Sequence, residues 1–355
     1  MAFIDNWPLA KTRSAVDLAG WIESSVSAMG RAQTARIEPL YGDASPRRYV
    51  RVHLADGTSC IGMDASDERE SIAPFERIDA LLRGADIEAP EILARGGAEG
   101  FLLLADLGDR LLLDLPPDSP ECARSYEAAL ETLVAMQQRV DPAGLPDFDE
   151  AEIRRELGLF PEWFLSRFLQ EDLPDALLED AFEGIVDALL EQPRVFMHRD
   201  YHAANLMLLP DQRIGVIDFQ DAVAGPVSYD LVSLLRDVYR SWDAAQRGAW
   251  SARYLRLART AGVLDASVSP EQWALWCDWV GAQRCLKILG IFSRLHYRDG
   301  KPKYLASLGQ TLSHLLDCCR AVGPLRPLGR RLAEYPERVQ LRTRELMQQT
   351  ALSAG

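Results

Sequence analysis

Lysine and net positive charge are what this sequence has least of. Lysine occurs only at Lys11, Lys287, Lys301 and Lys303 among 355 residues, and arginine supplies the other basic side chains. Asp and Glu number 53 against 39 Lys and Arg, which gives a formal net charge of -14. A broad surface for nucleic acid or for an anionic membrane would carry the opposite sign. We therefore expect neither partner, and any phosphate must be bound locally.

Long apolar runs are also missing. No segment approaches the roughly 18 apolar residues of a membrane span, and the start, MAFIDNWPLAKTRSAVDLAGW, lacks the apolar core of a secretory signal. The hydrophobic fraction of 48% and the charged fraction of 26% are typical of a globular protein. We therefore expect a folded, cytoplasmic protein without a membrane partner, and nothing in the sequence indicates a protein partner.

Cysteine is present, but not in the spacing that builds a site. None of the six residues forms a CxxC pair, which argues against a zinc site and a disulfide framework. We predict free and mostly buried thiols. The six are Cys60, Cys122, Cys277, Cys285, Cys318 and Cys319.

The first hundred residues have the pattern of strands and turns. Residues 47–65 contain two β-rich runs around Asp56-Gly57, a hairpin signal. Residues 71–84 repeat apolar side chains at helical spacing and end at Gly84, and residues 90–109 return to strands. These segments predict a strand-rich small lobe with one helix.

From Ser119 onward the pattern is mostly helical. Apolar stripes of period 3.6 cover 119–138, 149–169 and 173–192, and helices resume after Ser228 and continue into a polar tail. Between them, 194–200 and 206–221 are β-like runs, the second folded back at the turn PDQ. Trp273, Trp276 and Trp279 favour a packed helix face. We predict an α+β protein with two lobes, 1–105 and 106–355.

Three polar residues stand at intervals that kinases use for phosphoryl transfer. Asp200 lies in FMHRDYHAAN, Asn205 follows five residues later, and Asp218 follows after a further thirteen in IGVIDFQD. In kinases an Asp of the catalytic loop accepts the acceptor's hydroxyl proton, while a nearby Asn and a later Asp bind Mg²⁺. A polar turn would explain each residue singly. The three in register favour phosphoryl transfer.

A metal-dependent hydrolase is an alternative for the same stretch, with His198, Asp200, His202 and Asp218 as ligands. Asn205 suits magnesium better than zinc. His198 follows the apolar run RVFM, so we expect it to brace the loop by hydrogen bonds. Asp230 begins a helix, where we expect a structural role.

The segment MHRDYHAANLMLLPDQRIGVIDFQDAVAGPVSYDLVSLLRD resembles the core of the aminoglycoside phosphotransferase and choline kinase-like superfamily, which has a protein kinase-like bilobal fold. Asp230 lies only twelve positions after Asp218, too few for a protein kinase activation segment, so a small acceptor is expected. GDASPRRYVRV, CIGMDASDERESIAPFERI, GFLLLADLGD and LKILGIFSRLHYRDGKPKYL are similar to the anomeric sugar kinases of cell-wall recycling. The resemblance covers residues 42–305.

The resemblance implies an ATP- and Mg²⁺-dependent kinase that phosphorylates the C1 hydroxyl of N-acetylmuramate and N-acetylglucosamine, in peptidoglycan recycling toward UDP-N-acetylmuramate. It implies that Asp200 is catalytic and that Asn205 and Asp218 bind the metal. The loop from Gly42 to Arg48 would cover ATP, and Ala105 and Leu107 would meet adenine at the hinge. The expected nucleotide contacts are Gly42, Ser45, Arg47, Arg48, Ala105 and Leu107.

One departure from the kinase pattern concerns the small-lobe lysine. Met63 stands where that lysine would pair with the phosphates, and Glu70 or Glu76 would lose its usual partner. An arginine such as Arg47 could replace the charge. A nucleotide-binding pseudokinase is therefore an alternative, as is a kinase of another hydroxyl acceptor such as an aminoglycoside, choline or homoserine.

The acceptor pocket is the least specified part of the sequence. N-acetylmuramate carries a carboxylate, which basic side chains would bind. Asp221 could orient a sugar hydroxyl, and His202 could line the pocket or brace the loop. The basic candidates in the stretch similar to the sugar kinases are Arg294, Arg298, Lys287 and Lys301.

Overall fold

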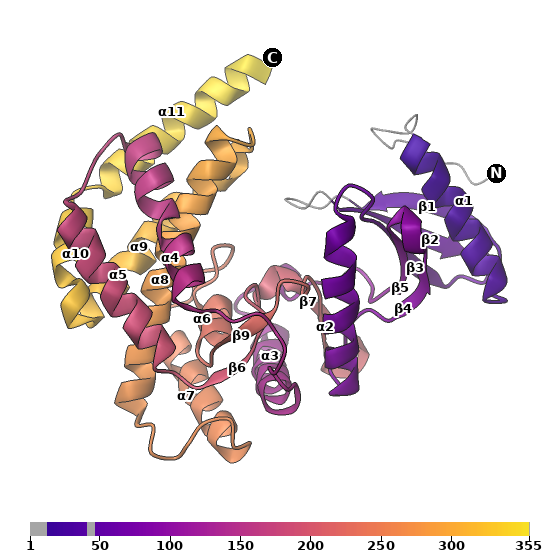
Figure 1. The fold of residues 1–355 in the computed structure, drawn as a ribbon, viewed down its shortest axis with the longest axis horizontal. Helices are drawn as coiled ribbons and strands as arrows, with labels where there is room; N and C mark the ends of the chain where they lie inside the picture. Colours follow the sequence, from indigo (N-terminus) through magenta and orange to yellow (C-terminus); the bar gives the residue numbers. More distant parts are fainter. Residues whose placement is uncertain (1–12, 41–46, 355) are drawn as a thin grey trace. The chain divides into compact units, whose positions relative to one another are not determined.

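The computed structural model describes residues 13–40 and 47–354 (Figure 1). The chain divides into two compact units, one formed by Met1–Ser125 with Asn205–Asp221 and the other by Tyr126–Ala204 with Ala222–Gly355. The expected boundary lies at residue 105. The first unit continues past it to Ser125 and also takes in the returning segment 205–221.

A five-stranded antiparallel sheet forms the centre of the first unit. Its strands are β1 (Thr34–Leu40), β2 (Arg48–Leu54), β3 (Ser59–Asp64), β4 (Ile92–Arg95) and β5 (Phe101–Ala105), in the order β1-β2-β3-β5-β4. The predicted hairpin at Asp56-Gly57 joins β2 to β3. Gly57 there has a φ of +84°, which favours glycine.

Helix α1 (Arg13–Ala28) packs on this sheet, so the prediction of a single helix in this region was wrong. Leu18, Ile22 and Val26 recur every four residues and join the core of the sheet. Gly62 permits the close approach, because a Cβ there would lie 2.8 Å from the Ile22 side chain. The stripe is narrow and flanked by small residues, which is why the sequence signal was weak.

The predicted helix α2 (Ile72–Gly84) buries Phe75, Ile78 and Leu82. The returning segment forms the antiparallel pair β7 (Leu206–Leu208) and β8 (Ile214–Val216), joined by the predicted turn at 210–212. Backbone hydrogen bonds from Leu208 to Arg110 and from Val216 to Glu88 attach this pair to the first unit.

The second unit is mostly helical, as predicted. It contains one two-stranded antiparallel sheet, β6 (Arg194–Met197) with β9 (Val223–Pro226), and α3 (Pro120–Arg139) enters it from the first unit. The segment 149–169 forms an α-helix followed by a π-helix. The other helices that the argument uses are α4 (Glu150–Leu157), the π-helix η4 (Phe160–Leu169), α5 (Asp175–Leu190), α6 (Tyr229–Leu235), α7 (Ala244–Thr260), α8 (Pro270–Tyr297), α9 (Leu308–Ala321), α10 (Arg326–Leu332) and α11 (Pro336–Ala354).

The long helix α8 is the structural axis of the second unit, in contact with α4, α5, α6, α9 and η4 (Figure 1). It starts at a Ser269 cap whose hydroxyl accepts the Gln272 amide. Gly290 lies against Leu159, where an added Cβ would be 2.5 Å from the backbone. Trp273, Trp276 and Trp279 are buried, which confirms the packed face expected of them.

The polar tail docks on this unit rather than standing apart. Helix α11 contacts α9 and η4, with Tyr335 and Val339 buried. Arg338 pairs with Glu171 at 2.5 Å and donates to the Leu169 carbonyl at 3.1 Å.

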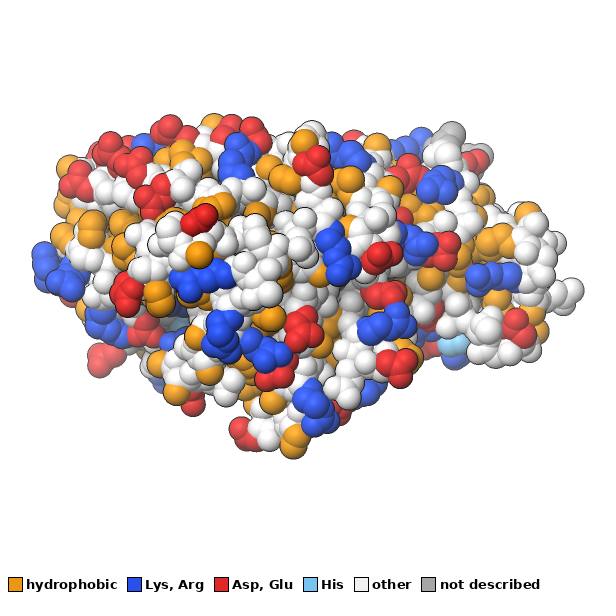
Figure 2. All heavy atoms as spheres, turned by 90° about the horizontal axis from the view of Figure 1, so that it is seen from below, with side chains coloured by type: hydrophobic (Ala, Val, Ile, Leu, Met, Phe, Trp, Pro, Cys, Tyr) orange, Lys and Arg blue, Asp and Glu red, His pale blue; other side chains and the backbone are white. Residues whose placement is uncertain are grey.

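The distribution of surface charge and the state of the cysteines agree with what the composition predicts. All six cysteines are free and buried, as predicted. Acidic and basic side chains are interspersed on the face drawn in Figure 2. None of the helices in the described ranges combines the length and the apolar content needed to cross a bilayer.

Candidate active site

The loop that carries Asp200 starts where β6 ends, and Asp230 anchors it from α6. The Asp230 carboxylate accepts the backbone amides of His198 at 2.7 Å and Arg199 at 3.0 Å. His198 is buried, and its Nδ1 accepts the Asp200 amide at 3.3 Å. Burial raises the pKa of Asp230 to about 6, against the lowering effect of His198 and of the two amides. Hydrogen bonds to its backbone amides therefore fix the conformation of the loop.

Asp200 itself is partly exposed in the second unit. Burial opposes its ionisation, but the charges of Lys287, His202 and Arg284 outweigh this and hold its pKa at about 2. The carboxylate is therefore ionised at any physiological pH. It can orient a hydroxyl group and accept its proton as bonding to phosphorus develops, although it is a weak base.

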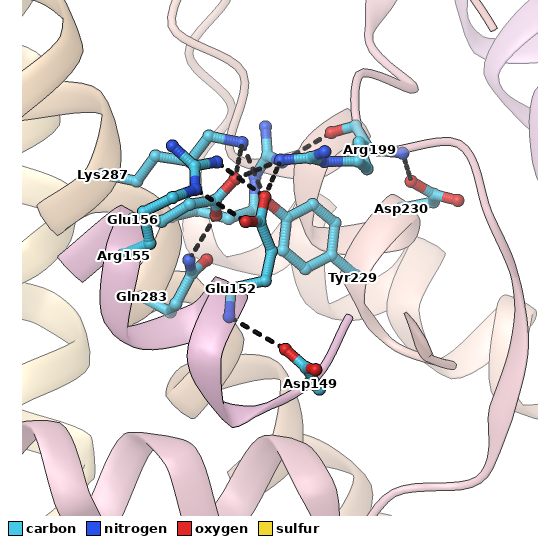
Figure 3. Close-up of polar contacts among 10 residues, drawn as sticks. Asp149, Glu152, Arg155, Glu156, Arg199, Tyr229, Asp230, Gln283 and Lys287 are labelled. Atoms are coloured by element: carbon cyan, nitrogen blue, oxygen red, sulfur yellow. Dashed lines mark hydrogen bonds and ion pairs between the residues drawn. The ribbon is translucent and has the colours of Figure 1, made fainter. Parts of the chain in front are cut away.

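Buried ionic contacts surround the residue before Asp200 (Figure 3). Arg199 pairs with Glu156 and, at 3.0 Å, with Glu152, both from α4. Lys287 of α8 lies 3.0 Å from Glu156, and Gln283 donates to the same carboxylate at 2.8 Å. These contacts join α4 and α8 to the loop.

His202 lies two residues after Asp200, beside an aromatic ring. The rings of His202 and Tyr239 are 5.6 Å apart in an edge-to-face arrangement, and Tyr239 is 44% exposed. The His202 Nδ1 is buried without a hydrogen-bond partner among the described residues. Asp237 fixes both segments, because its carboxylate accepts the amides of Ala203 at 3.2 Å and Tyr239 at 2.9 Å.

Asn205 and Asp218 face each other in the first unit. The Asn205 amide nitrogen is 3.5 Å from Asp218 Oδ2, and Gln220 donates to Asp218 Oδ1 at 3.1 Å. Asp218 has a φ of +63°, and the next residue, Phe219, packs on Phe75 of α2 with ring centroids 4.8 Å apart. A positive φ at a residue other than glycine is held by its surroundings and is frequent at functional sites.

The donor set of this pair fits a magnesium ion. A carboxylate and an amide supply the hard oxygen ligands that Mg²⁺ prefers, and the Asp218 side chain is 46% exposed. The hydrolase alternative has no such support. Within the described ranges, no group of three or more His, Cys, Asp or Glu side chains could hold a metal ion.

The two arginines expected near the phosphates have different surroundings. Arg47 lies 3.6 Å from the Asp218 carboxylate with its side chain 8% exposed. Arg48 instead pairs at 2.7 Å with the buried Asp64 and contacts Asp67. Arg47 is therefore beside the expected metal ligand Asp218, whereas Arg48 neutralises a core carboxylate. Gly42 and Ser45 lie outside the described residues.

The hinge segment follows β5. Ala105 ends the strand and donates its amide to Glu91 at 2.8 Å. Asp106 makes the turn by accepting the Gly108 amide at 2.9 Å, and Arg51 pairs with the Asp106 carboxylate at 2.7 Å. The Leu107 amide has no hydrogen-bond partner within the part of the chain that the structure describes. It is available to a ligand.

The small-lobe lysine has no direct replacement in β3. Met63 is fully buried in this strand, and Glu76 of α2 pairs with Arg95 at 2.7 Å. Glu70 is exposed. The Lys–Glu pair that kinases form in this lobe is thus absent from the described residues of the first unit, and Arg47 is a cation beside the expected metal ligand Asp218.

The remaining acceptor candidates are dispersed. Asp221 is exposed and accepts a hydrogen bond from Gln220 at 3.1 Å. Arg298 is exposed and makes a two-point contact with Asp299. Arg294 is partly buried, and its Nε finds no partner among the described side chains. Of the two arginines, Arg294 has the greater capacity for an added carboxylate.

Sequence reasoning did not select Glu156, Asp237 or Tyr239 for this site. Asp237 and Tyr239 lie shortly after α6, where a polar and an aromatic residue next to a short helix were the only available signal. Glu156 carried no local signal, because its partners are 43 and 131 positions away at Arg199 and Lys287.

Comparison with known families decides the assignment. The family described as "Phosphotransferase enzyme family" matches residues 36–266, which include Asp200, Asn205 and Asp218. The chain belongs to this family. A protein of Pseudomonas aeruginosa named N-acetylmuramate/N-acetylglucosamine kinase is 40% identical to it over 329 residues, covering 89% of this chain and 95% of that protein. A protein of the same name from Neisseria meningitidis is 37% identical, covering 85% and 91%.

Solved structures of other proteins share the fold of this chain. The choline kinase of Streptococcus pneumoniae superposes with a TM-score of 0.55 at 12% identity, covering 85% of this chain and 99% of that one. The macrolide 2'-phosphotransferase of Brachybacterium faecium gives 0.55 at 15% identity, covering 82% and 97%. The predicted α+β fold of the aminoglycoside phosphotransferase type is confirmed.

Proposed function

We propose that this protein is a cytoplasmic, ATP-dependent kinase that phosphorylates the C1 hydroxyl of N-acetylmuramate and N-acetylglucosamine. The observation that carries the proposal is the extent of similarity to kinases named for these two sugars, at 40% and 37% identity over most of the chain. The Asp200, Asn205 and Asp218 set supports it, because each residue suits one requirement of phosphoryl transfer.

Asp200 is the proposed proton acceptor. Its carboxylate orients the C1 hydroxyl and takes the proton as the oxygen attacks the γ-phosphorus in line. A hemiacetal hydroxyl is more acidic than an ordinary alcohol, so a carboxylate with a pKa of about 2 is sufficient. The anchored backbone from His198 to Ala203 keeps this group in one orientation.

Asn205 and Asp218 are the proposed magnesium ligands. The bound ion would neutralise charge on the triphosphate and hold it for in-line attack. Arg47, now 3.6 Å from Asp218, is the proposed phosphate contact in place of the missing lysine. The amide of Leu107, with the carbonyl of Ala105, is the proposed adenine contact at the hinge.

Tyr239 and His202 are the proposed walls of the sugar site. An exposed aromatic ring can cover the apolar face of a pyranose, and the His202 ring packs edge-to-face against it. Arg294 is the proposed contact for the carboxylate that N-acetylmuramate has and N-acetylglucosamine lacks.

The test is phosphorus and proton NMR of the purified protein with Mg·ATP and each sugar separately. We expect a new phosphate signal coupled to the anomeric proton with both sugars, and none with the Asp200→Asn variant. Transfer only to an aminoglycoside, choline or homoserine would replace the acceptor assignment. Binding of Mg·ATP without transfer to any acceptor would support the pseudokinase that Met63 suggests.

A further inference from the structure

Lys287 is the one buried lysine among those that the structure describes. Its Nζ lies 3.0 Å from Glu156 and 3.3 Å from the Tyr229 hydroxyl, and both partners are buried. Lys301 is only partly buried and Lys303 is exposed. In a chain that uses arginine almost everywhere else, the compact ammonium group is kept where it meets a buried carboxylate.

The ion pair is part of a larger network that stability alone does not explain (Figure 3). Glu156, 1% exposed, is contacted by Lys287, Arg199 and Gln283. Burial opposes its ionisation, yet the charges of Lys287 and Arg199 keep its pKa below the ordinary value. Desolvating such charges is unfavourable, and apolar residues of similar volume often stabilise a core as well or better.

The network fixes the backbone that precedes Asp200. Arg199 has a φ of +77°, a conformation that is unfavourable for a residue other than glycine. Its amide donates to Asp230 at 3.0 Å, and its carbonyl accepts from Arg284 at 2.9 Å. Its side chain is held by α4, as described above. The amide, the carbonyl and the Nη2 of Arg199 thus contact Asp230 of α6, Arg284 of α8 and the carboxylates of α4.

Lys287 also acts on Asp200 through its charge. Among the groups that favour the ionised form of Asp200, Lys287 has the largest effect, ahead of His202 and Arg284. The ammonium group therefore pairs directly with Glu156 and at the same time stabilises the negative charge of Asp200.

We propose that Lys287, together with Glu156 and Arg199, is a positioning device that holds the Asp200 loop in its working orientation without any covalent modification. Protein kinases order corresponding segments with a phosphorylated residue that binds arginines, and they require a Lys–Glu pair in the small lobe. Here the small-lobe position is Met63, and a buried Lys–Glu pair is built against the catalytic loop instead. The proposal rests on the assignment of Asp200 as the proton acceptor.

The experiment compares Lys287→Met with the double variant Glu156→Gln/Lys287→Met. The single variant leaves Glu156 buried without its ammonium partner, so it should be less stable in thermal unfolding. The double variant removes both charges and should recover most of that stability. If the single variant does not fold, the double variant carries the test. Lys303→Met removes an exposed lysine of the same unit and is the matched control.

The deciding readout is the carboxyl pKa of Asp200, followed by carbon NMR of Asp-labelled protein, with Asp200→Asn identifying the signal. In the double variant we expect this pKa to be at least about one pH unit higher than in the wild type. We also expect kcat to fall roughly 10- to 100-fold, as for a misplaced catalytic group, while the Mg·ATP dissociation constant stays within about twofold.

The pH dependence follows from the same charge. Catalysis needs ionised Asp200, so a higher pKa of Asp200 shifts the low-pH limb of the kcat–pH profile to higher pH. A double variant with the wild-type carboxyl pKa and wild-type kcat would overturn the proposal and reduce Lys287 to a partner of Glu156. Absence of sugar phosphorylation by the wild type would instead contradict the proposed function, and the carboxyl pKa would still test Lys287.

Discussion

The two parts of the proposed active site differ in how firmly they are held. In the second unit, the Asp200 loop receives hydrogen bonds from Asp230 and ionic contacts from α4 and α8. In the first unit, Asn205 and Asp218 are partly or largely exposed, and the nearest cation to Asp218 is Arg47 at 3.6 Å. The difference favours a proposed proton acceptor that is fixed in advance and a proposed metal site that its ligands complete.

The same contrast explains where the buried Lys–Glu pair lies. β3 offers Met63 in an apolar environment, and Glu76 is paired near the surface with Arg95. The pair of Lys287 and Glu156 lies instead in the second unit. The chain thus places the buried charges of Lys287 and Glu156 next to the loop that carries Asp200.

The largest effect is expected from Asp200→Asn. The substitution keeps the size of the side chain but removes the proton acceptor, so kcat should fall about 10³-fold or more, within the range typical of general base catalysis. The Mg·ATP dissociation constant should stay nearly unchanged. Steady-state kinetics and calorimetry measure both, with Asp211→Asn in the exposed β7–β8 turn as control. A variant with near-normal kcat would show that Asp200 is not the base.

Asp218→Ala tests the proposed metal site of the first unit. It should abolish the part of nucleotide affinity that depends on magnesium, a loss of about 100-fold or more, because a carboxylate ligand is removed. Calorimetric titrations with ATP in the presence and absence of Mg²⁺ separate the two contributions. Asn205→Ala should show a smaller loss of the same kind. An unchanged response to Mg²⁺ in Asp218→Ala would exclude this residue from the metal site.

Arg47 and Arg48 provide a matched pair within the first unit. Arg47→Met should weaken Mg·ATP binding roughly tenfold with little change in thermal stability, since Arg47 lies 3.6 Å from the exposed Asp218. Arg48→Met should do the opposite, because it leaves the buried Asp64 without its cation, at a cost of about 3–5 kcal/mol. Nucleotide titration and thermal unfolding of both variants decide the point, and equal behaviour would refute the distinction.

The smallest effect concerns the sugar side. Tyr239→Ala should raise KM for both sugars roughly five- to tenfold and leave the Mg·ATP constant unchanged, because an aromatic face is lost. Tyr239→Phe keeps the ring and should remain close to the wild type. Arg294→Met should raise KM for N-acetylmuramate alone. If the alanine variant binds both sugars normally, the sugar does not lie on this ring.

The sequence predicts those parts of the molecule that local patterns encode. Periodicity and turn residues are sufficient for the β2–β3 hairpin, for α2 and for the helical second unit. The spacing of Asp200, Asn205 and Asp218 predicts the proposed phosphotransferase centre, because one loop and one hairpin separate them.

Such local patterns do not predict contacts between segments that are distant in the sequence. Helix α1 has a narrow apolar stripe whose partner sheet is not visible in its own sequence. The pairing of Glu156 with Lys287 and the joint capping of Ala203 and Tyr239 by Asp237 depend on how whole helices pack. The sequence offers the residues, but tertiary packing decides which of them meet.

Hydrogen exchange with and without Mg·ATP tests the contrast between the two halves most directly. Amides of residues 198–203 should already be protected in the ligand-free protein and change little on addition of Mg·ATP, whereas amides of residues 217–221 should gain protection. Rapid exchange across 198–203 that slows only when Mg·ATP binds would contradict the account, because the catalytic loop would then be ordered by its ligand rather than by the buried network.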